Sequence, residues 1–517
     1  MTVLWAGLLV GWLQLTPLYR AADEPTHVDL VLRLADGGSY AAPGSLQVDP
    51  RVRASFPLAG LSSAERPELA ALYPLPYAST DVPARDVPFD ELPSDPALPP
   101  FPNQMTQHPP LYYLLLAGST HLLPGFGDWS FPHQVAGLRL VSALLLLPLP
   151  VLAAACARRL GAPGPVQLTA ALLPLAVPQL AHVGGSVNND ALLVLLGAAA
   201  ALPLVQVSRG DVSRRTAVAV GLLLGLALLT KAWAVGLLAW AALAYGLALL
   251  PAVRRGRALT SGLLAGGLAM VVGGWWWVAN VVRFGALQPQ GMDLLPARDL
   301  EPDLWAFTAG MLTRLTASTW GNFGWLEVQV AEQVRVAAAL VVVLGLSLAV
   351  ARRSEPAGAR TAMAVALAAL CVQFAVVYQQ SLKNYLRGGY FAGLQGRYLF
   401  SFVAVVAVLV AVGLCGLLPE RRRHLAPRLA LASVVLLQAV GVLTALRGFW
   451  WPSGEGLRRA LAIQAAWAPY GRGTTVLAVL GVCASAAALL ALTGRRDGPD
   501  GGRRLEPVAT SARAGAP

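Results

Sequence analysis

Charged residues are scarce in this chain. Asp, Glu, Lys and Arg make up 13% of its 517 residues, about half the share found in an average soluble domain. Apolar residues make up 56%, and long apolar runs recur along most of the sequence. Runs of about 20 apolar residues are typical of transmembrane helices. This composition excludes a soluble enzyme, a disulfide-held secreted domain and a disordered protein, and it predicts an all-α polytopic membrane protein.

Lysine and cysteine are also rare. Only Lys231 and Lys383 are lysines among the 39 basic residues, and the four cysteines all lie in apolar runs or at their ends. This cysteine usage excludes an external disulfide framework and has no metal-type spacing. The arginines gather in short stretches between apolar runs, which is typical of cytoplasmic loops. The net charge of +12 therefore indicates membrane topology and not a nucleic-acid partner. The clusters are Arg158-Arg159, Arg214-Arg215, Arg254-Arg255, Arg352-Arg353, Arg421-Arg422-Arg423 and Arg495-Arg496.

About twelve segments have the length and apolarity expected of membrane spans. Placing both termini in the cytoplasm puts every short Arg-rich loop on the inner side. The apolar stretch 111–123 is left out, because about 13 residues make ~20 Å of helix, less than the ~30 Å hydrocarbon core. We expect it to form an interfacial or re-entrant helix near 110–123 on the outer face. The predicted spans are residues 2–18, 134–157, 164–182, 189–207, 216–230, 233–251, 259–282, 334–351, 361–379, 398–418, 427–446 and 473–493.

The spans divide the chain into a core and a C-terminal part. Residues 1–418 form the expected transmembrane core, and residues 419–493 add further transmembrane helices. The first span lacks the basic region and cleavage site of a signal peptide, so we expect it to be an uncleaved helix. The remaining segments are three external loops at 19–133, 283–333 and 447–472, and a cytoplasmic tail at 494–517 whose Arg, Gly and Pro content predicts disorder.

Acidic residues directly follow the first span. Asp23 and Glu24 are adjacent, and His27 lies one turn further on if the segment is helical. A carboxylate held at the membrane surface can act as a general base on a hydroxyl group. The alternative interpretation is an ordinary acidic turn at a helix exit.

A second motif opens the expected interfacial helix. His108 precedes two prolines, which favour a helix start, and Tyr112 follows them. These side chains are candidates for substrate binding. They are also compatible with a simple helix cap and with the aromatic belt of a membrane protein.

Polar residues at the outer ends of other spans supply further candidates. Asn188, Asn189 and Asp190 form a triplet that can bind hydroxyl groups or a cation, or can cap the following helix. Cations at outer helix ends are costly and often functional, and they can hold a phosphate, although snorkelling to the interface is the alternative for each one. The cations concerned are Arg139, Lys231, Arg283 and Arg397.

A Trp- and Gly-rich loop precedes the eighth span. Trp320 and Asn322 lie within it, and its glycines favour a tightly shaped loop. The tryptophans can stack on a sugar or an isoprenoid, or can belong to the interfacial belt.

Taken in order, these motifs resemble the integral-membrane glycosyltransferases of the C-type fold (GT-C), in particular protein O-mannosyltransferases, lipid A aminoarabinose transferases and uncharacterised bacterial relatives. The resemblance runs from residue 1 to about residue 418. The matching strings are DEPTH at 23–27, HPPLYY at 108–113, GSVNNDALLVLL at 185–196, GLALLTK at 225–231, STWGNFGWL at 318–326 and QGRYLF at 395–400.

The resemblance implies a role for each matching residue. Asp23 would be the general base that deprotonates the acceptor hydroxyl, with Glu24 as a helper or an alternative base. His108 would line the reaction chamber, and Arg397 with Lys231 would hold the donor phosphate. The substrate-binding set expected from all the motifs is His27, His108, Tyr112, Asn188, Asn189, Asp190, Lys231, Trp320, Asn322, Arg397 and Tyr398.

The implied reaction takes place outside the cytoplasmic membrane. Its donor would be a polyprenyl-phosphate sugar, transferred with inversion to a glycan, lipid or protein acceptor of the cell envelope. Some relatives use a divalent metal, but the sequence contains no ligand cluster that assigns one. The long insert between His27 and His108 and the last two spans depart from the family pattern.

Two other classes of function remain open at this point. A transporter or lipid flippase would place ionisable groups near the bilayer midplane and would show matching repeats, whereas the candidate residues here lie at the outer ends of spans. A non-catalytic envelope-assembly protein on the same scaffold predicts that Asp23→Asn changes nothing.

Overall fold

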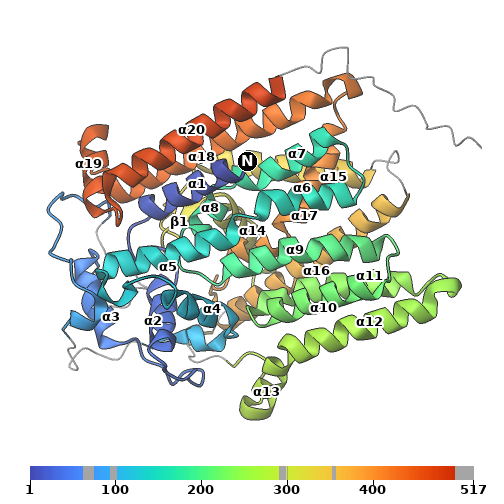
Figure 1. Cartoon of the computed structure of the whole chain (residues 1–517), viewed down its shortest axis with the longest axis horizontal. Helices are drawn as coiled ribbons and strands as arrows, with labels where there is room; N and C mark the ends of the chain where they lie inside the picture. The colour runs from blue at the N-terminus through green and yellow to red at the C-terminus, as the bar shows by residue number, and fades with distance from the viewer. Residues whose placement is uncertain (62–74, 94–101, 290–297, 300, 352–356, 495–517) are drawn as a thin grey trace, which may run out of the picture.

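Helices dominate the computed structural model, which describes residues 1–61, 75–93, 102–289, 298–299, 301–351 and 357–494 (Figure 1). Long helices lie side by side as a bundle, and the shorter helices α2, α3, α4 and α19 gather at one end of it. The α-helices are α1 (Thr2–Leu15), α2 (Glu24–Ala35), α3 (Pro50–Leu58), α4 (Leu111–Thr120), α5 (Phe131–Leu146), α6 (Leu149–Arg159), α7 (Gly164–Leu172), α8 (Pro178–Gly184), α9 (Asp190–Ser208), α10 (Arg214–Leu228), α11 (Val235–Ala248), α12 (Arg255–Ala269), α13 (Trp275–Phe284), α14 (Leu304–Trp320), α15 (Glu332–Ala351), α16 (Ala357–Gly388), α17 (Val403–Cys415), α18 (Ala426–Trp450), α19 (Leu457–Trp467) and α20 (Gly471–Gly494).

Short elements connect these helices. A two-residue antiparallel ladder pairs β1 (Asn322–Phe323) with β2 (Val328–Gln329). A π-helical turn, η8 (Met270–Gly274), joins α12 to α13. The 3₁₀ turns are η2 (Phe89–Glu91), η3 (Gln104–Gln107), η4 (Phe126–Asp128), η5 (Leu173–Ala176), η6 (Ala232–Ala234), η7 (Ala252–Arg254), η9 (Gly396–Phe402) and η10 (Glu420–Leu425).

The described helices establish a polytopic membrane protein. Eight of them are long and apolar enough to cross a bilayer, and nine do so if the bent pair 164–176 and 178–184, which turns by 70°, is one span. The prediction of about twelve spans includes three further helices, those of the predicted spans 2–18, 216–230 and 233–251. Their helices α1, α10 and α11 are shorter than the eight counted here, with 14, 15 and 14 residues.

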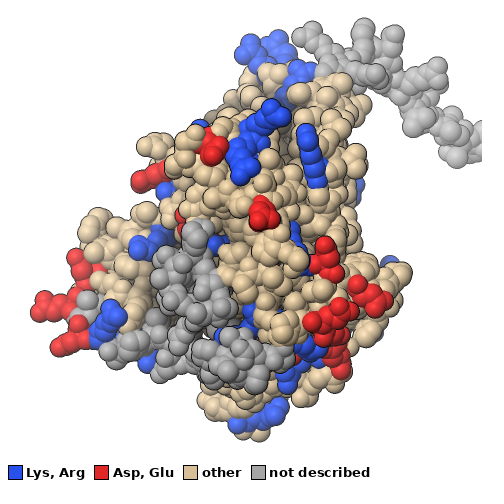
Figure 2. Space-filling model, turned by 90° about the vertical axis from the view of Figure 1, so that its left-hand side faces the viewer, with Lys and Arg blue, Asp and Glu red and all other residues tan. Residues whose placement is uncertain are grey.

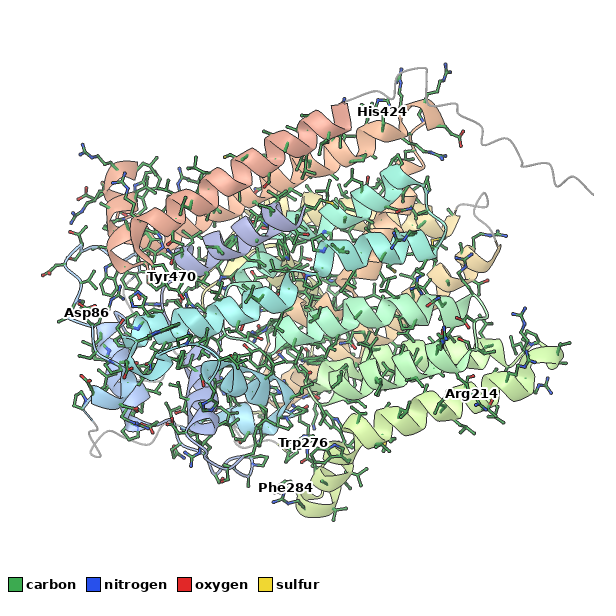
Figure 3. The ribbon with its side chains drawn as sticks, in the orientation of Figure 1. Asp86, Arg214, Trp276, Phe284, His424 and Tyr470 are labelled. Atoms are coloured by element: carbon green, nitrogen blue, oxygen red, sulfur yellow. The ribbon has the colours of Figure 1, made fainter. Side chains whose placement is uncertain are left out.

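The described parts of the predicted external loop 19–133 form a cap of short helices at one end of the bundle. It contains α2, α3 and α4, and α4 has only 10 residues, consistent with the expected non-spanning helix near 110–123. Arg214 and His424, from the predicted inner loops, lie toward the opposite end from Asp86 and Tyr470 (Figure 3). Figure 2 looks at the capped end, where acidic and basic side chains both reach the surface. The predicted disordered tail at 494–517 lies almost wholly outside the described residues.

Close helix contacts align the parts of the bundle that carry the candidate site. A Cβ atom added to Gly197 of α9 would lie 2.1 Å from the carbonyl oxygen of Ser401 in η9. Small residues allow membrane helices to approach in this way. On η9, the backbone carbonyl of Tyr398 also accepts a hydrogen bond from Gln373 Nε2 of α16 at 2.9 Å. The helix α9, the turn η9 and the middle of α16 are thereby held together.

Candidate active site at the capped end of the bundle

A cavity of about 670 Å³ lies where the cap of short helices meets the bundle. Its walls come from segments that are far apart in the sequence: the start of α2, η3, η6, the end of α16 and η9. Six of the predicted site residues line it, and these are Asp23, His27, His108, Lys231, Arg397 and Tyr398.

Asp23 is placed at the cavity by the start of α2. It precedes the first residue of the helix and adopts a left-handed backbone conformation with φ of 63°, which is uncommon for a residue other than glycine. Its side chain is 24% exposed, and its Oδ2 accepts a hydrogen bond from Arg397 Nη2 at 3.0 Å. Among the described residues no donor reaches the second oxygen, Oδ1, so that oxygen is available to a ligand in the cavity.

Two buried ion pairs converge beside Asp23. Lys231 Nζ lies 2.7 Å from Asp190 Oδ1, and Arg397 Nε lies 3.2 Å from Asp190 Oδ2. The Asp190 side chain is fully buried, and the two cations are 5% and 7% exposed. Asp190 thus connects the predicted polar triplet to the two predicted phosphate-binding cations. Buried charges of this kind need partners, and here the pairing also holds both cations at the cavity wall.

Two histidines face the cavity in uncharged form. Burial, reinforced by the positive charges of Lys231 and Arg397, lowers the pKa of both His27 and His108 well below the ordinary value of 6.5. His27 Nδ1 lies 3.0 Å from the hydroxyl oxygen of Tyr113, whose ring stacks on the imidazole. The Nδ1 atom of His108 is buried and has no hydrogen-bond partner among the described residues. A neutral imidazole with an unsatisfied nitrogen can bind a hydroxyl group of a ligand.

An aromatic pair forms another part of the wall. The rings of Trp233 and Tyr398 stack at 4.4 Å with an angle of 22°. Lys231 Nζ and the Arg397 guanidinium carbon lie 5.7 and 5.9 Å from the centre of the Tyr398 ring, within range of cation–π attraction. The pair therefore offers an apolar surface directly next to the buried charges.

Glu24 and Arg139 lie outside the cavity and form a structural ion pair. Both side chains are fully buried, 2.6 Å apart. The Glu24 carboxylate also accepts hydrogen bonds from the backbone N–H groups of Tyr19 and Val187. Arg139 donates to carbonyl oxygens at the end of α1 and just after it. Neither side chain is free to take a proton from a substrate or to hold a phosphate, in contrast to what the sequence predicted.

The other predicted site residues also lie away from the cavity wall. Tyr112 is buried with its hydroxyl 2.7 Å from Ser142 Oγ, and Asn188 Oδ1 accepts the N–H of Asp190 at 2.8 Å. Arg283 is solvent-exposed and lies near the ring of Phe284. The remaining three are Asn189, Trp320 and Asn322. Asn189 is buried, and its side-chain amide has no partner within the described part of the chain; Trp320 lines a separate apolar cavity; and Asn322 is buried in β1.

Three polar side chains on α16 line the cavity without having been predicted. They are Gln380, Lys383 and Asn384. The predicted span ended at residue 379, whereas α16 continues to Gly388, so these residues were assigned to a loop. For Lys383, the rarity of lysine was a signal in the sequence that could have indicated a role, because both lysines of the chain line this cavity.

A metal site is not evident at this position. Among the described residues, no three His, Cys, Asp or Glu side chains gather in a way that could hold a metal ion. The carboxylates Asp23 and Asp190 are both engaged with cations.

These features define a polytopic all-α membrane protein with a charged, partly enclosed cavity at one end of its bundle. The chain belongs to the family described as "Predicted membrane protein (DUF2142)", whose model matches residues 6–406. That match covers every residue that lines the cavity. No curated protein matches the chain.

Two solved structures are similar to this chain at low identity. One is ArnT from Cupriavidus metallidurans bound to undecaprenyl phosphate, with 15% identity and a TM-score of 0.44, over 94% of this chain and 76% of that one. The other is the same protein in the apo state, with 15% identity and a TM-score of 0.40, over 75% of this chain and 67% of that one.

Proposed function

We propose that this protein is a membrane glycosyltransferase that moves a sugar from a polyprenyl-phosphate donor to a hydroxyl group of a cell-envelope acceptor. The observation that carries the proposal is the convergence of Asp23, Lys231 and Arg397 on one cavity. Such a transfer needs a base for the acceptor and positive charge for the departing phosphate. The same three residues lie in the sequence motifs that resemble those of GT-C enzymes.

Asp23 is the proposed general base. Its Oδ1 is free among the described residues, while Oδ2 is fixed by Arg397. The acceptor O–H proton would pass to this carboxylate as the acceptor oxygen attacks the anomeric carbon. The bond between the anomeric carbon and the phosphate oxygen would break, and its electron pair would leave with the polyprenyl phosphate. Glu24 has a positioning role instead, because its ion pair with Arg139 fixes the start of α2.

Lys231 and Arg397 are the proposed electrostatic stabilisers of the leaving phosphate. An Arg guanidinium binds phosphate as a fork and a Lys ammonium as a point charge. The Trp233–Tyr398 pair is suited to contact the sugar face or the first isoprene units. We place this cavity at the outer face of the cytoplasmic membrane, because the Arg-rich loops then lie inside.

The test is donor consumption by purified protein in nanodiscs. The protein would be given labelled polyprenyl-phosphate pentoses and hexoses, with membrane extract as the source of acceptor. We expect the wild type to consume one donor and Asp23→Asn to consume none. Transfer that persists unchanged in Asp23→Asn would overturn the assignment of the base. If neither protein consumed any donor, a lipid-translocation assay would test the alternative, a transporter or flippase of envelope precursors.

A further inference from the structure

The charges around the cavity are nearly balanced by the protein itself. Lys231 and Arg397 are matched by Asp190 and Asp23 through the ion pairs described above. Lys383 also lines the cavity, and none of the ion pairs found among the described residues includes it. One positive charge is therefore in excess in the part of the wall that the structure describes.

Lys383 belongs to a polar face of α16. Gln380, Lys383 and Asn384 stand at positions i, i+3 and i+4, which lie on the same side of an α-helix, and all three line the cavity. Asn384 is held in place because its Nδ2 donates to the carbonyl oxygen of Ala392 at 3.2 Å. The flanking amide of Gln380 supplies hydrogen-bond donors beside the ammonium group.

The end of α16 is also rigidly supported, although Lys383 itself is solvent-exposed. Phe307 and Met311 of α14 and Val377 and Tyr385 of α16 form a small buried cluster. The face with Lys383 is thus a fixed part of the wall and not a frayed helix end, which favours binding of a ligand over a purely solubilising role.

We propose that Lys383, flanked by Gln380 and Asn384, is the primary binding site for the phosphodiester group of the donor. A polyprenyl-phosphate sugar carries one negative charge, which equals the one positive charge in excess. Lys231 and Arg397 would act later, when bond breaking places a second negative charge on the phosphate. Asp23 takes up the acceptor proton in the same step and so releases its hold on Arg397. This inference rests on the proposed donor class.

The test measures binding of two lipids of equal chain length to full-length protein in nanodiscs. One lipid is a polyprenyl phosphate methyl ester, which has one negative charge, and the other is the neutral polyprenol. We expect the wild type to bind the phosphodiester more tightly than the polyprenol, and Lys383→Gln to weaken phosphodiester binding by about 10-fold without changing polyprenol binding. Raising the salt concentration should weaken phosphodiester binding to the wild type more than to the variant.

Two variants serve as controls. Lys383→Arg keeps the charge and should retain most of the phosphodiester affinity. Arg360→Gln removes an exposed cation near the other end of the same helix and should leave binding of both lipids unchanged.

The outcomes distinguish the role proposed for Lys383 from the proposed class of donor. If Lys383→Gln binds the phosphodiester as the wild type does, or loses affinity for both lipids equally, the role of Lys383 is overturned while the donor class stands. If the wild type itself does not distinguish the two lipids, the proposed donor and this inference fall together.

Discussion

Two adjacent carboxylates have very different surroundings. Asp23 is 24% exposed and faces the cavity, whereas Glu24 is fully buried against Arg139. The sequence analysis expected Asp23 to be the base and Glu24 to be a helper or an alternative base. Their different surroundings favour a catalytic role for Asp23 and a structural role for Glu24, and substitutions should separate the two roles.

Asp23→Asn should abolish transfer and leave the fold intact. Loss of a general base lowers a rate by about 10²–10⁴-fold. The fold should hold because the buried Arg397 keeps its second partner, Asp190. The rate of donor consumption and the midpoint of thermal unfolding in detergent measure the two effects. Asp86→Asn, a change of the same kind at an exposed residue of the cap, should alter neither quantity.

Glu24→Gln should destabilise the folded protein. Removing one partner of a buried ion pair leaves the other charge uncompensated, at a cost of about 3–5 kcal/mol, because Arg139 is fully buried. Thermal unfolding should therefore occur at a lower temperature than in Asp23→Asn. A Glu24→Gln protein that unfolds like the wild type would show that the pair does not support the start of α2.

His27 should make stability depend on pH in the acidic range. Burial lowers the pKa of His27 in the folded protein well below 6.5, so the unfolded chain binds a proton that the folded chain does not. Titration of His27 has no effect on the free energy of unfolding above about pH 7. As the pH falls below 6.5, it lowers that free energy by up to about 1.4 kcal/mol per pH unit.

His27→Gln removes this titration. The unfolding midpoint of the variant, measured relative to the wild type, should rise as the pH falls from 7.5 to 5.5. Because other groups titrate in both proteins, only the difference between them is informative. An offset that stays constant with pH would contradict the neutral form assigned to His27.

At the scale of the elements, the contact between α9 and η9 sets the position of the charged groups. Asp190 is the first residue of α9, and Arg397 lies in η9. Gly197 allows the two elements to touch, since a Cβ atom there would lie 2.1 Å from a backbone oxygen. The distance between Asp190 and Arg397 thus depends on Gly197, which is not among the residues that line the cavity.

Gly197→Ala should separate these elements. We expect a loss of about 1–3 kcal/mol of stability from overpacking and a loss of transfer activity beyond what the stability change explains. Unfolding midpoints and activity at a temperature where the variant is folded measure the two effects. Gly246→Ala, in α11, where a Cβ atom meets no neighbour within 4 Å, should behave like the wild type.

The sequence was sufficient to predict where most helices lie but not how they pair. Each predicted span contains a helix, because long apolar runs can satisfy their backbone only as helices in a bilayer. Arg139 and Arg397 looked alike as cations at span ends. What separates them is their partners: Arg139 binds Glu24 and carbonyl groups at the end of α1, whereas Arg397 binds Asp23 at the cavity. Such long-range contacts leave no local pattern in the sequence.

At the scale of the whole molecule, the arginine distribution predicts which end of the bundle faces outward. In a cysteine-free background, Asp86→Cys should react with a membrane-impermeant thiol reagent in intact cells. Arg214→Cys, near the opposite end of the bundle, should react only after the membrane is permeabilised. The reverse labelling pattern would place the cavity on the cytoplasmic side and would remove the external reaction from consideration.

The ion pairs at the cavity have a consequence for turnover. Asp23 and Asp190 are paired with Lys231 and Arg397, so a phosphate that moves from Lys383 to these two cations must compete with carboxylates that are covalently part of the protein. This competition limits how tightly any anion is retained. Under the proposed mechanism, Asp23 would pair with Arg397 again as soon as it lost the acceptor proton. The carboxylate would then help to expel the phosphate product from this cation.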